Sequence, residues 1–349
     1  MFDFILSWPG APRIISYFVL LGVGVFFLVK FCDIFVDSAS SIAKKLKIPP
    51  LIIGLTVMAM GTSCPELAVS VSDSIASLSS GANAEIALGN VVGSNICNIL
   101  VVLGLSALFT PLIVRKAILK KELPILLGIS SLFVVFGCFF ALNGKLAILR
   151  WEAIVFVALM IAYITYVVIS ALKNQNKDEQ EPSEEIVIKD MPIWRSIILC
   201  IVGIAGIIIG GEMVVFGAEN IAIEGATAVG FDPGLTKALV GLTIVAVGTS
   251  LPELVVSVVA AKKGENELAL GNVVGSNIFN ILFILGIAGT VNPLTTGSQF
   301  IVDVLVMLGV TVLLFALSLG GKLGKKQGIV LLSCYGVYLA YLITRTVIS

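Results

Sequence analysis

Long apolar runs separated by short polar breaks dominate the hydrophobic pattern of this chain. Each run is about 20 residues or longer, which is the length that an α-helix needs to cross the hydrocarbon core of a bilayer. The pattern therefore predicts an all-α polytopic membrane protein with ten transmembrane helices. Their expected ranges are 14–38, 49–79, 84–109, 122–141, 149–172, 196–223, 235–261, 266–289, 301–319 and 326–346.

Two sequence phrases occur in both halves of the chain, in the same order. Residues 61–71 (GTSCPELAVSV) match 248–258 (GTSLPELVVSV) at nine of eleven positions, and residues 86–98 (IALGNVVGSNICN) match 268–280 (LALGNVVGSNIFN) at eleven of thirteen. The copies of the first phrase lie five predicted helices apart. Because five is an odd number, the two copies enter the membrane from opposite faces. The sequence thus predicts an inverted repeat, which in secondary transporters places the substrate site at the repeat interface near the bilayer midplane.

A polar stretch between the two copies, residues 173–190 (KNQNKDEQEPSEEIVIKD), separates five predicted helices from the other five. We expect a first five-helix repeat over residues 1–172, a linker over 173–194 and a second five-helix repeat over 195–349. Lys and Arg are unequally distributed, with 16 in loops on the side of the linker and 5 on the other side, Lys30 being set aside within the first helix. The positive-inside rule then predicts an inner or plasma membrane protein with a cytoplasmic linker and both termini outside.

Composition excludes several classes of function. Hydrophobic residues make up 58% of the chain and charged residues only 13%, whereas about 25% of a soluble domain is charged. The net charge is zero, so nucleic acid is not an expected partner. The chain has no histidine, which rules out Ser-His or Cys-His dyads and HExxH zinc sites, and it has no cofactor fingerprint. We therefore expect neither an enzyme nor a cofactor, with the lipid bilayer as the surrounding phase.

A proline precedes the acid in each copy of the first phrase, as Pro65–Glu66 and Pro252–Glu253. Proline inside a helix removes one hydrogen bond and clashes with the preceding turn, so both helices are predicted to break near the midplane. Non-helical backbone at membrane depth is tolerated where it lines a polar cavity. Duplication kept for packing alone would explain the repeated glycines, but it would not explain two matched acids, which are costly in a membrane unless partnered.

The side chains and freed carbonyls of the two phrases supply oxygen donors, which suit hard cations and Ca²⁺ in particular. Two carboxylates ~5 Å apart at an effective dielectric of ~20 repel by roughly 3 kcal/mol. A divalent cation relieves this repulsion, protons compete for the same acids, and monovalent ions can use the neighbouring hydroxyls and carbonyls. The candidate donors are Glu66, Glu253, Thr62, Ser63, Thr249, Ser250, Ser94, Asn98, Ser276 and Asn280. Two further amides fit the site and interhelical hydrogen bonding equally well: Asn90 and Asn272.

At these residues the sequence resembles the calcium/cation antiporter superfamily, specifically its prokaryotic sodium/calcium exchanger branch. The paired GTSxPE and GNVVGSNIxN phrases look like the two alpha repeats of that family, and the resemblance covers the whole ten-helix plan. It implies electrogenic exchange of sodium for calcium by alternating access, in which the first and sixth helices slide against a fixed core. A monomer is sufficient for this mechanism.

The resemblance also implies a role for each candidate residue. Glu66 and Glu253 match the central calcium-coordinating acids, and the carbonyls of Thr62 and Thr249 lie beside them. Sodium-coordinating positions of the family are matched by the hydroxyls of Ser63, Ser94, Ser250 and Ser276 and the carbonyls of Ala59 and Ala246, while Asn98 and Asn280 line the central site.

One departure from the family pattern affects the predicted ions. Some members, including potassium-dependent ones, have aspartate at the position of Asn280, whereas this chain has asparagine in both repeats. The difference argues against potassium co-transport and leaves two acids in the site. A calcium/proton antiporter of the same fold and, from a different class, a cation channel are the alternatives. The hydroxyls around the acids favour sodium over protons, and the inverted repeat favours alternating access over a channel.

The first predicted helix contains charged residues that the repeated phrases do not explain. Lys30 lies three residues before Asp33, and Asp37 follows one turn later. Residues at this spacing share a helix face, so we expect a local ion pair between Lys30 and Asp33 near the membrane edge.

Overall fold

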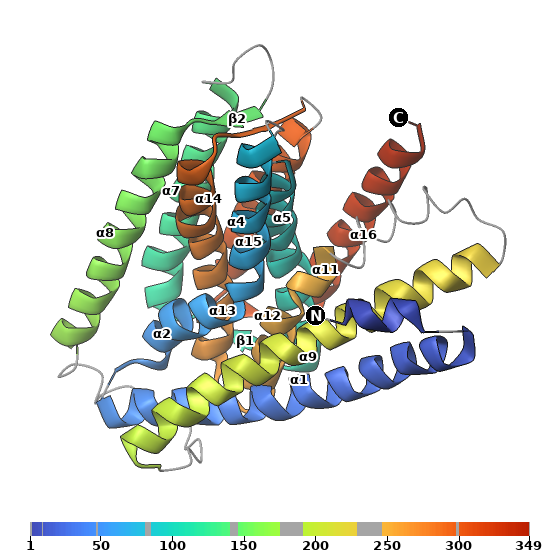
Figure 1. Cartoon of the computed structure of the whole chain (residues 1–349). Helices are drawn as coiled ribbons and strands as arrows, with labels where there is room; N and C mark the ends of the chain where they lie inside the picture. Colours follow the sequence, from blue (N-terminus) through green and yellow to red (C-terminus); the bar gives the residue numbers. More distant parts are fainter. Residues whose placement is uncertain are drawn as a thin grey trace.

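The structure is a computed structural model, in which residues 2–8, 10–46, 48–80, 85–139, 146–174, 191–228, 246–297 and 300–348 are described. Figure 1 shows an almost entirely helical protein. Among the described residues, eight helices are long and apolar enough to cross a membrane, and a bent pair, Pro50–Thr62 and Cys64–Ser79, supplies a ninth. Residues 235–245 of the seventh predicted helix and 175–190 of the predicted linker lie outside the described residues.

The helical segments follow the predicted order in both halves, including the two breaks. In the first half they are η1 (Asp3–Ser7), α1 (Gly10–Leu46), α2 (Pro50–Ile53), η2 (Gly54–Met58), α3 (Ala59–Thr62), α4 (Cys64–Ser80), α5 (Glu85–Cys97), η3 (Asn98–Val102), α6 (Leu103–Phe109), η4 (Ile118–Glu122), α7 (Leu123–Val134), η5 (Val135–Phe139) and α8 (Arg150–Asn174). In the second half they are α9 (Ile193–Ala228), α11 (Ala246–Thr249), α12 (Leu251–Lys262), α13 (Asn266–Phe279), η9 (Asn280–Ile284), α14 (Leu285–Val291), α15 (Phe300–Ser318) and α16 (Lys325–Ile348).

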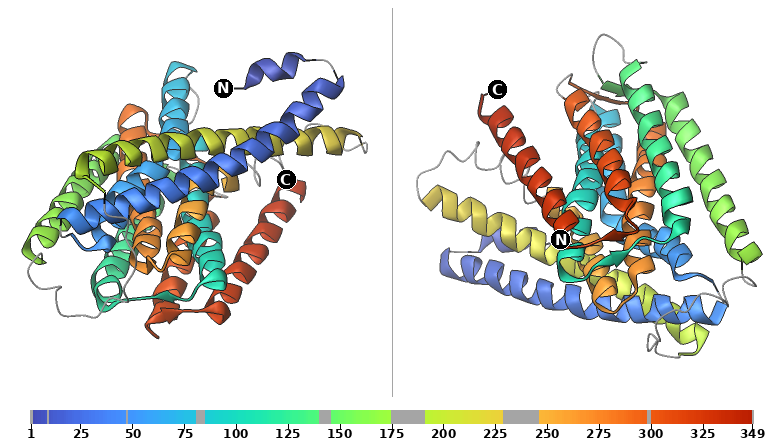
Figure 2. Two further views of the ribbon diagram at one scale, coloured as in Figure 1. Left: turned by 90° about the horizontal axis from the view of Figure 1, so that it is seen from below. Right: turned by 180° about the vertical axis from the view of Figure 1, so that it is seen from behind.

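The first helix of each half is much longer than a membrane is thick. α1 has 37 residues and α9 has 36, so each is about 55 Å long, against a hydrocarbon core of about 30 Å. A helix of this length must be strongly inclined or extend beyond the bilayer. Both ribbon views show α1 and α9 side by side at a steep angle to the remaining helices (Figures 1 and 2).

Glycines of α9 allow α1 to approach its backbone. Gly203 faces Phe35, whereas Gly217 faces Leu21, so the two helices run antiparallel. A Cβ atom at Gly210 would lie 2.9 Å from the backbone nitrogen of Leu28, closer than packed atoms tolerate. α1 and α9 therefore form one closely packed pair, and the other helices form a bundle beside it.

Two short antiparallel ladders join the halves of the bundle. β1 (Leu112–Ile113) pairs with β4 (Lys322–Leu323), and β2 (Leu146–Ile148) pairs with β3 (Leu294–Thr296). β1 follows α6 in the first half, and β3 follows the equivalent helix α14 in the second. Likewise β2 precedes α8 and β4 precedes the equivalent helix α16, so each ladder is the counterpart of the other. β1 and β2 lie at opposite ends of the bundle in Figure 1, which confirms that the repeat is inverted.

The helices that carry the GNVVGSN phrase form the centre of the bundle. Within the apolar window of each span, 83% of Ile86–Phe109 and 94% of Asn266–Val291 are buried, against at most 44% for the other spanning helices. Close approach again depends on glycine, because a Cβ atom at Gly275 would lie 2.7 Å from the Leu55 carbonyl oxygen. The broken span of the first repeat thus packs directly against the inner helix of the second.

Candidate ion-binding site

Both predicted helix breaks are present, and they occur at matching serines. α3 ends one residue before Ser63 and α4 begins one residue after it, with a bend of 48° between the two parts of the span. α11 and α12 flank Ser250 in the same way. The backbone angles agree closely, with φ −85° and ψ 10° at Ser63 and φ −86° and ψ 4° at Ser250. The two repeats therefore share one local geometry at this point.

Proline explains why the breaks occur there. Pro65 and Pro252 occupy the second position of the helix that follows each break, where a missing N–H costs nothing. The carbonyl group four residues earlier, on Gly61 or Gly248, loses the amide that would bind it in a continuous helix. Each break thus frees backbone oxygen one turn before an acid.

The two acids are fully buried and belong to one site. Glu66 and Glu253 are both 0% exposed. The Ser63 hydroxyl donates to Oε1 of Glu253 over 2.8 Å, and the Ser94 hydroxyl donates to Oε1 of Glu66 over 3.4 Å. Because Ser63 and Glu253 come from different repeats, the site lies at the repeat interface, as the inverted repeat predicts.

Four buried oxygens at this interface have no hydrogen-bond donor within the described residues. They are Oε2 of Glu66, Oε2 of Glu253, Oδ1 of Asn98 and Oδ1 of Asn280. A buried unpaired acceptor costs about 1–3 kcal/mol, and more when it is charged. A hard cation would satisfy all four, and Ca²⁺ takes carboxylate and amide oxygens of this kind. The donor set therefore fits the predicted cation.

The remaining predicted ligands lie at or beside the two breaks. The Ser276 hydroxyl is 3.5 Å from the Ala59 carbonyl oxygen, so a side chain of the second repeat meets the backbone of the first. Ser250 of the second repeat lies beside the Cys97 thiol of α5 in the first repeat. Ala246 is the first residue of α11, the short helix that ends at Thr249, directly before the second break. Residues of both repeats therefore meet beside the first break.

Asn90 and Asn272, left open between two roles above, connect helices. The Asn90 amide donates to the Glu66 carbonyl oxygen over 3.1 Å, and its own oxygen lies 3.5 Å from the Thr249 hydroxyl. In the other repeat, the Thr62 hydroxyl donates to the Asn272 side-chain oxygen over 3.3 Å. Both amides therefore fasten a broken helix of one repeat to an inner helix of the other.

Sequence reasoning missed two residues at the centre of the interface, Asn95 and Asn277. Each is 1% exposed. Their amides donate to each other's backbone carbonyl oxygens, in both directions over 3.3 Å. Their identical position in the two GSN phrases was the available signal, because a buried amide kept in both copies needs partners.

The predicted ion pair between Lys30 and Asp33 is wrong. Asp33 and Asp37 bind Lys263 instead, with Nζ–Oδ1 distances of 3.2 and 2.6 Å. Lys263 lies in the turn between α12 and α13, so it connects α1 to the bundle. Spacing along one helix cannot show this partner, because the turn reaches α1 only in the folded protein.

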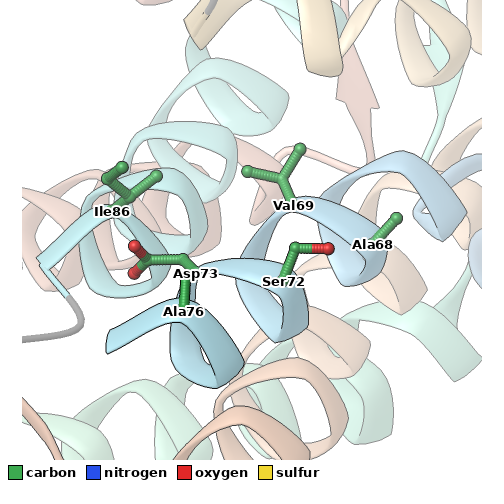
Figure 3. Close-up of a pocket in the computed structure, with 6 residues that line it drawn as sticks. All are labelled: Ala68, Val69, Ser72, Asp73, Ala76 and Ile86. Carbon is green, nitrogen blue, oxygen red and sulfur yellow. The ribbon is translucent and has the colours of Figure 1, made fainter. Parts of the chain in front are cut away.

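An open hollow on α4 is separate from the ion site. Figure 3 shows the residues that line it, namely Ala68, Val69, Ser72, Asp73, Ala76 and Ile86. Oδ2 of Asp73 accepts a hydrogen bond from the Ala87 backbone amide over 3.0 Å, which satisfies one free N–H at the start of α5. Asp73 therefore acts as a helix cap, and no predicted ion ligand lines this hollow.

Comparison with known proteins agrees with this architecture. The family model described as "Sodium/calcium exchanger protein" matches residues 16–169 and 195–344. The chain belongs to the sodium/calcium exchanger family. The model thus matches this exchanger in two segments, and the gap between them, residues 170–194, contains the polar stretch 173–190.

Several relatives cover nearly the full length of this exchanger. Sodium/calcium exchanger MaX1 of Methanosarcina acetivorans is 36% identical over an alignment that covers 93% of this chain and 98% of MaX1. Putative antiporter CaxA of Alkalimonas amylolytica is 36% identical over 323 residues, covering 90% and 92%. A solved structure of the sodium-calcium exchanger NCX_Mj, soaked with Na⁺ and no Ca²⁺, has a TM-score of 0.75 at 31% identity and covers 94% of this chain and 99% of that one.

Proposed function

We propose that this protein exchanges sodium for calcium across the membrane by alternating access, and that the exchange is electrogenic. The observation that carries the proposal is the group of four buried, unpaired oxygens contributed by two acids and two amides of both repeats. The two carboxylates match the charge of one Ca²⁺. The ions are substrates, and neither a cofactor nor an enzymatic step is part of the proposal.

Each predicted ligand has a proposed role. Ca²⁺ binds between Glu66 and Glu253, with the carbonyl oxygens of Thr62 and Thr249 beside it and the amides of Asn98 and Asn280 lining the same space. Sodium ions occupy the flanking positions, where hydroxyls and carbonyls gather near the breaks. These flanking ligands are Ser63, Ser94, Ser250, Ser276, Ala59 and Ala246.

Alternating access would use the boundary between the α1–α9 pair and the bundle. The backbone contact at Gly210 makes α1 and α9 one unit, and this unit lies at a steep angle beside the bundle (Figure 2). We propose that sliding of the pair uncovers the site from one side at a time. One chain contains the complete site, so a monomer is sufficient.

Flux in proteoliposomes is the test. Sodium-loaded vesicles are expected to take up Ca²⁺, and a clamped inside-positive potential is expected to accelerate uptake because more than two Na⁺ leave for each Ca²⁺. Lower pH should raise the KM for Ca²⁺, since protons compete for the same carboxylates. Insensitivity to the potential would contradict electrogenic exchange.

The same vesicles distinguish the alternatives. Uptake driven by a pH gradient alone, without sodium, would identify a calcium/proton antiporter. Absence of trans-accelerated calcium exchange would identify a channel. The hydroxyls that contact both acids, Ser63 and Ser94, support sodium as the counter-ion, because a proton carrier does not need them.

We also propose that the protein lies in the inner or plasma membrane with the linker in the cytoplasm and both termini outside. The excess of Lys and Arg in loops on the linker side supports this orientation. Alkaline phosphatase is active only outside the cytoplasm, so a fusion after Ser349 in a bacterial host is expected to be active and a fusion after residue 180 inactive. The opposite pattern would reverse the orientation.

A further inference from the structure

Four asparagines form a hydrogen-bonded network across the repeat interface, with Asn95 and Asn277 at its centre and Asn98 and Asn280 at its two ends. The Asn280 amide nitrogen donates to Oδ1 of Asn95 over 3.0 Å, and the Asn98 amide nitrogen donates to Oδ1 of Asn277 over 3.1 Å. Asn95 and Asn277 donate in turn to each other's backbone carbonyl oxygens. Every hydrogen bond of this network therefore joins one repeat to the other.

The backbone fixes the orientation of the side-chain amides in this network. A backbone carbonyl group can only accept a hydrogen bond, so the amides of Asn95 and Asn277 must direct their NH₂ groups to those carbonyls. Their side-chain oxygens must then face Asn280 and Asn98, whose NH₂ groups bind them. Only one orientation of all four amides satisfies these bonds.

The orientation determines what Asn98 and Asn280 offer to an ion. Because their NH₂ groups are bound to Asn277 and Asn95, their Oδ1 atoms are left buried and unpaired. Reversal of either amide would replace a ligand oxygen with a hydrogen-bond donor that repels a cation. Both residues also begin a π-helical turn, η3 or η9, an irregularity that often occurs at functional sites.

We infer that Asn95 and Asn277 are positioning residues, each of which holds an ion-facing amide of the opposite repeat with its oxygen towards bound calcium. Asn95 positions Asn280, and Asn277 positions Asn98. This arrangement adds two neutral oxygens to the site while the charge stays at that of two carboxylates. The inference rests on the proposed function, since it assumes that calcium binds beside Asn98 and Asn280.

The test exploits the symmetry of a carboxylate, whose two terminal atoms are both oxygen. Asn95→Leu removes the acceptor for Asn280 and is expected to raise the KM for Ca²⁺ about 10- to 100-fold, the usual effect of losing a partner that orients a metal ligand. In an Asn280→Asp background orientation no longer matters, so the same change should leave the KM unchanged or lower it. In an Asn98→Asp background the full effect of Asn95→Leu should persist, because Asn95 does not orient Asn98.

The second positioning residue gives the mirror-image experiment. The effect of Asn277→Leu is expected to disappear in the Asn98→Asp background and to persist in the Asn280→Asp background. A role in packing alone would give each leucine variant the same effect in both backgrounds, and that result would overturn the inference. Asn95→Ala and Asn277→Ala remove the same acceptors with smaller side chains, and they replace any leucine variant that fails to elute as a single folded species.

Calcium binding to the purified protein, measured by calorimetry, separates this inference from the proposed function. If the protein without substitutions does not bind Ca²⁺, the proposed function fails. If it binds Ca²⁺ and Asn95→Leu and Asn277→Leu bind it equally well, only the positioning role fails. The expected result is calcium affinity reduced by the same factor as the transport KM is raised. The thermal midpoint measured without calcium should also fall modestly, because each leucine leaves buried polar groups without their partners.

Discussion

Glu66→Gln and Glu253→Gln are each expected to abolish calcium transport while the protein stays folded in the membrane. Glutamine has nearly the same shape as glutamate and still accepts a hydrogen bond, so Ser63 and Ser94 keep their partners. It removes one of the two charges that Ca²⁺ neutralises. Loss of one partner from a buried charge pair costs about 3–5 kcal/mol, so transport should fall about 100-fold or more, measured as sodium-driven ⁴⁵Ca²⁺ uptake.

The matched control is Glu122→Gln. Glu122 is also a buried acid within a span, at 5% exposed. It lies at the end of η4 and accepts its hydrogen bond from the Tyr163 hydroxyl of α8 rather than at the ion site. The same substitution there should leave uptake close to that of the unaltered protein. Near-normal uptake by either Glu66→Gln or Glu253→Gln would refute the central assignment.

Gly275→Ala is expected to disrupt both the site and the fold around it. The added Cβ atom would lie 2.7 Å from the Leu55 carbonyl oxygen and 2.8 Å from the Ala59 Cβ atom, so α13 must move away from the first broken span. That movement separates the Ser276 hydroxyl from the Ala59 carbonyl oxygen beside it. Overpacking of this kind costs about 1–3 kcal/mol of stability, so a lower thermal midpoint should accompany reduced uptake.

Gly309→Ala provides the comparison, because nothing lies within 4 Å of a Cβ atom placed at that glycine of α15. An alanine there should leave uptake unchanged and keep or slightly raise the thermal midpoint, since alanine favours a helix over glycine by about 1 kcal/mol. Equal behaviour of Gly275→Ala and Gly309→Ala would show that close backbone contact at Gly275 is not required.

Hydropathy predicted the bundle helices well but underestimated the inclined pair. The first helix, expected over residues 14–38, runs from Gly10 to Leu46, and the sixth, expected over residues 196–223, runs from Ile193 to Ala228. Hydropathy identifies the part of a helix that suits lipid. The additional turns are held by contacts between α1 and α9, which a search for apolar runs does not detect.

The sequence by itself determined the number and order of the helices, the inverted repeat, the two breaks and the acids beside them. These features depend on local chemistry: the length of apolar runs, the missing N–H of Pro65 and Pro252, and the cost of a carboxylate in an apolar segment. Because the repeat is visible in the sequence, the site could be predicted to lie at the interface between the two repeats before its geometry was known.

Only the tertiary structure decided which atoms face the ion and which hold others in place. Asn95 and Asn98 look alike in the sequence, but Asn95 has both its amide nitrogen and its side-chain oxygen bound within the asparagine network, whereas the side-chain oxygen of Asn98 is unpaired. Lys263 pairs with Asp33 and Asp37 across more than two hundred residues of chain. Such roles depend on distances and hydrogen-bond directions between helices that are far apart in the sequence, and these are set only when the two repeats pack together.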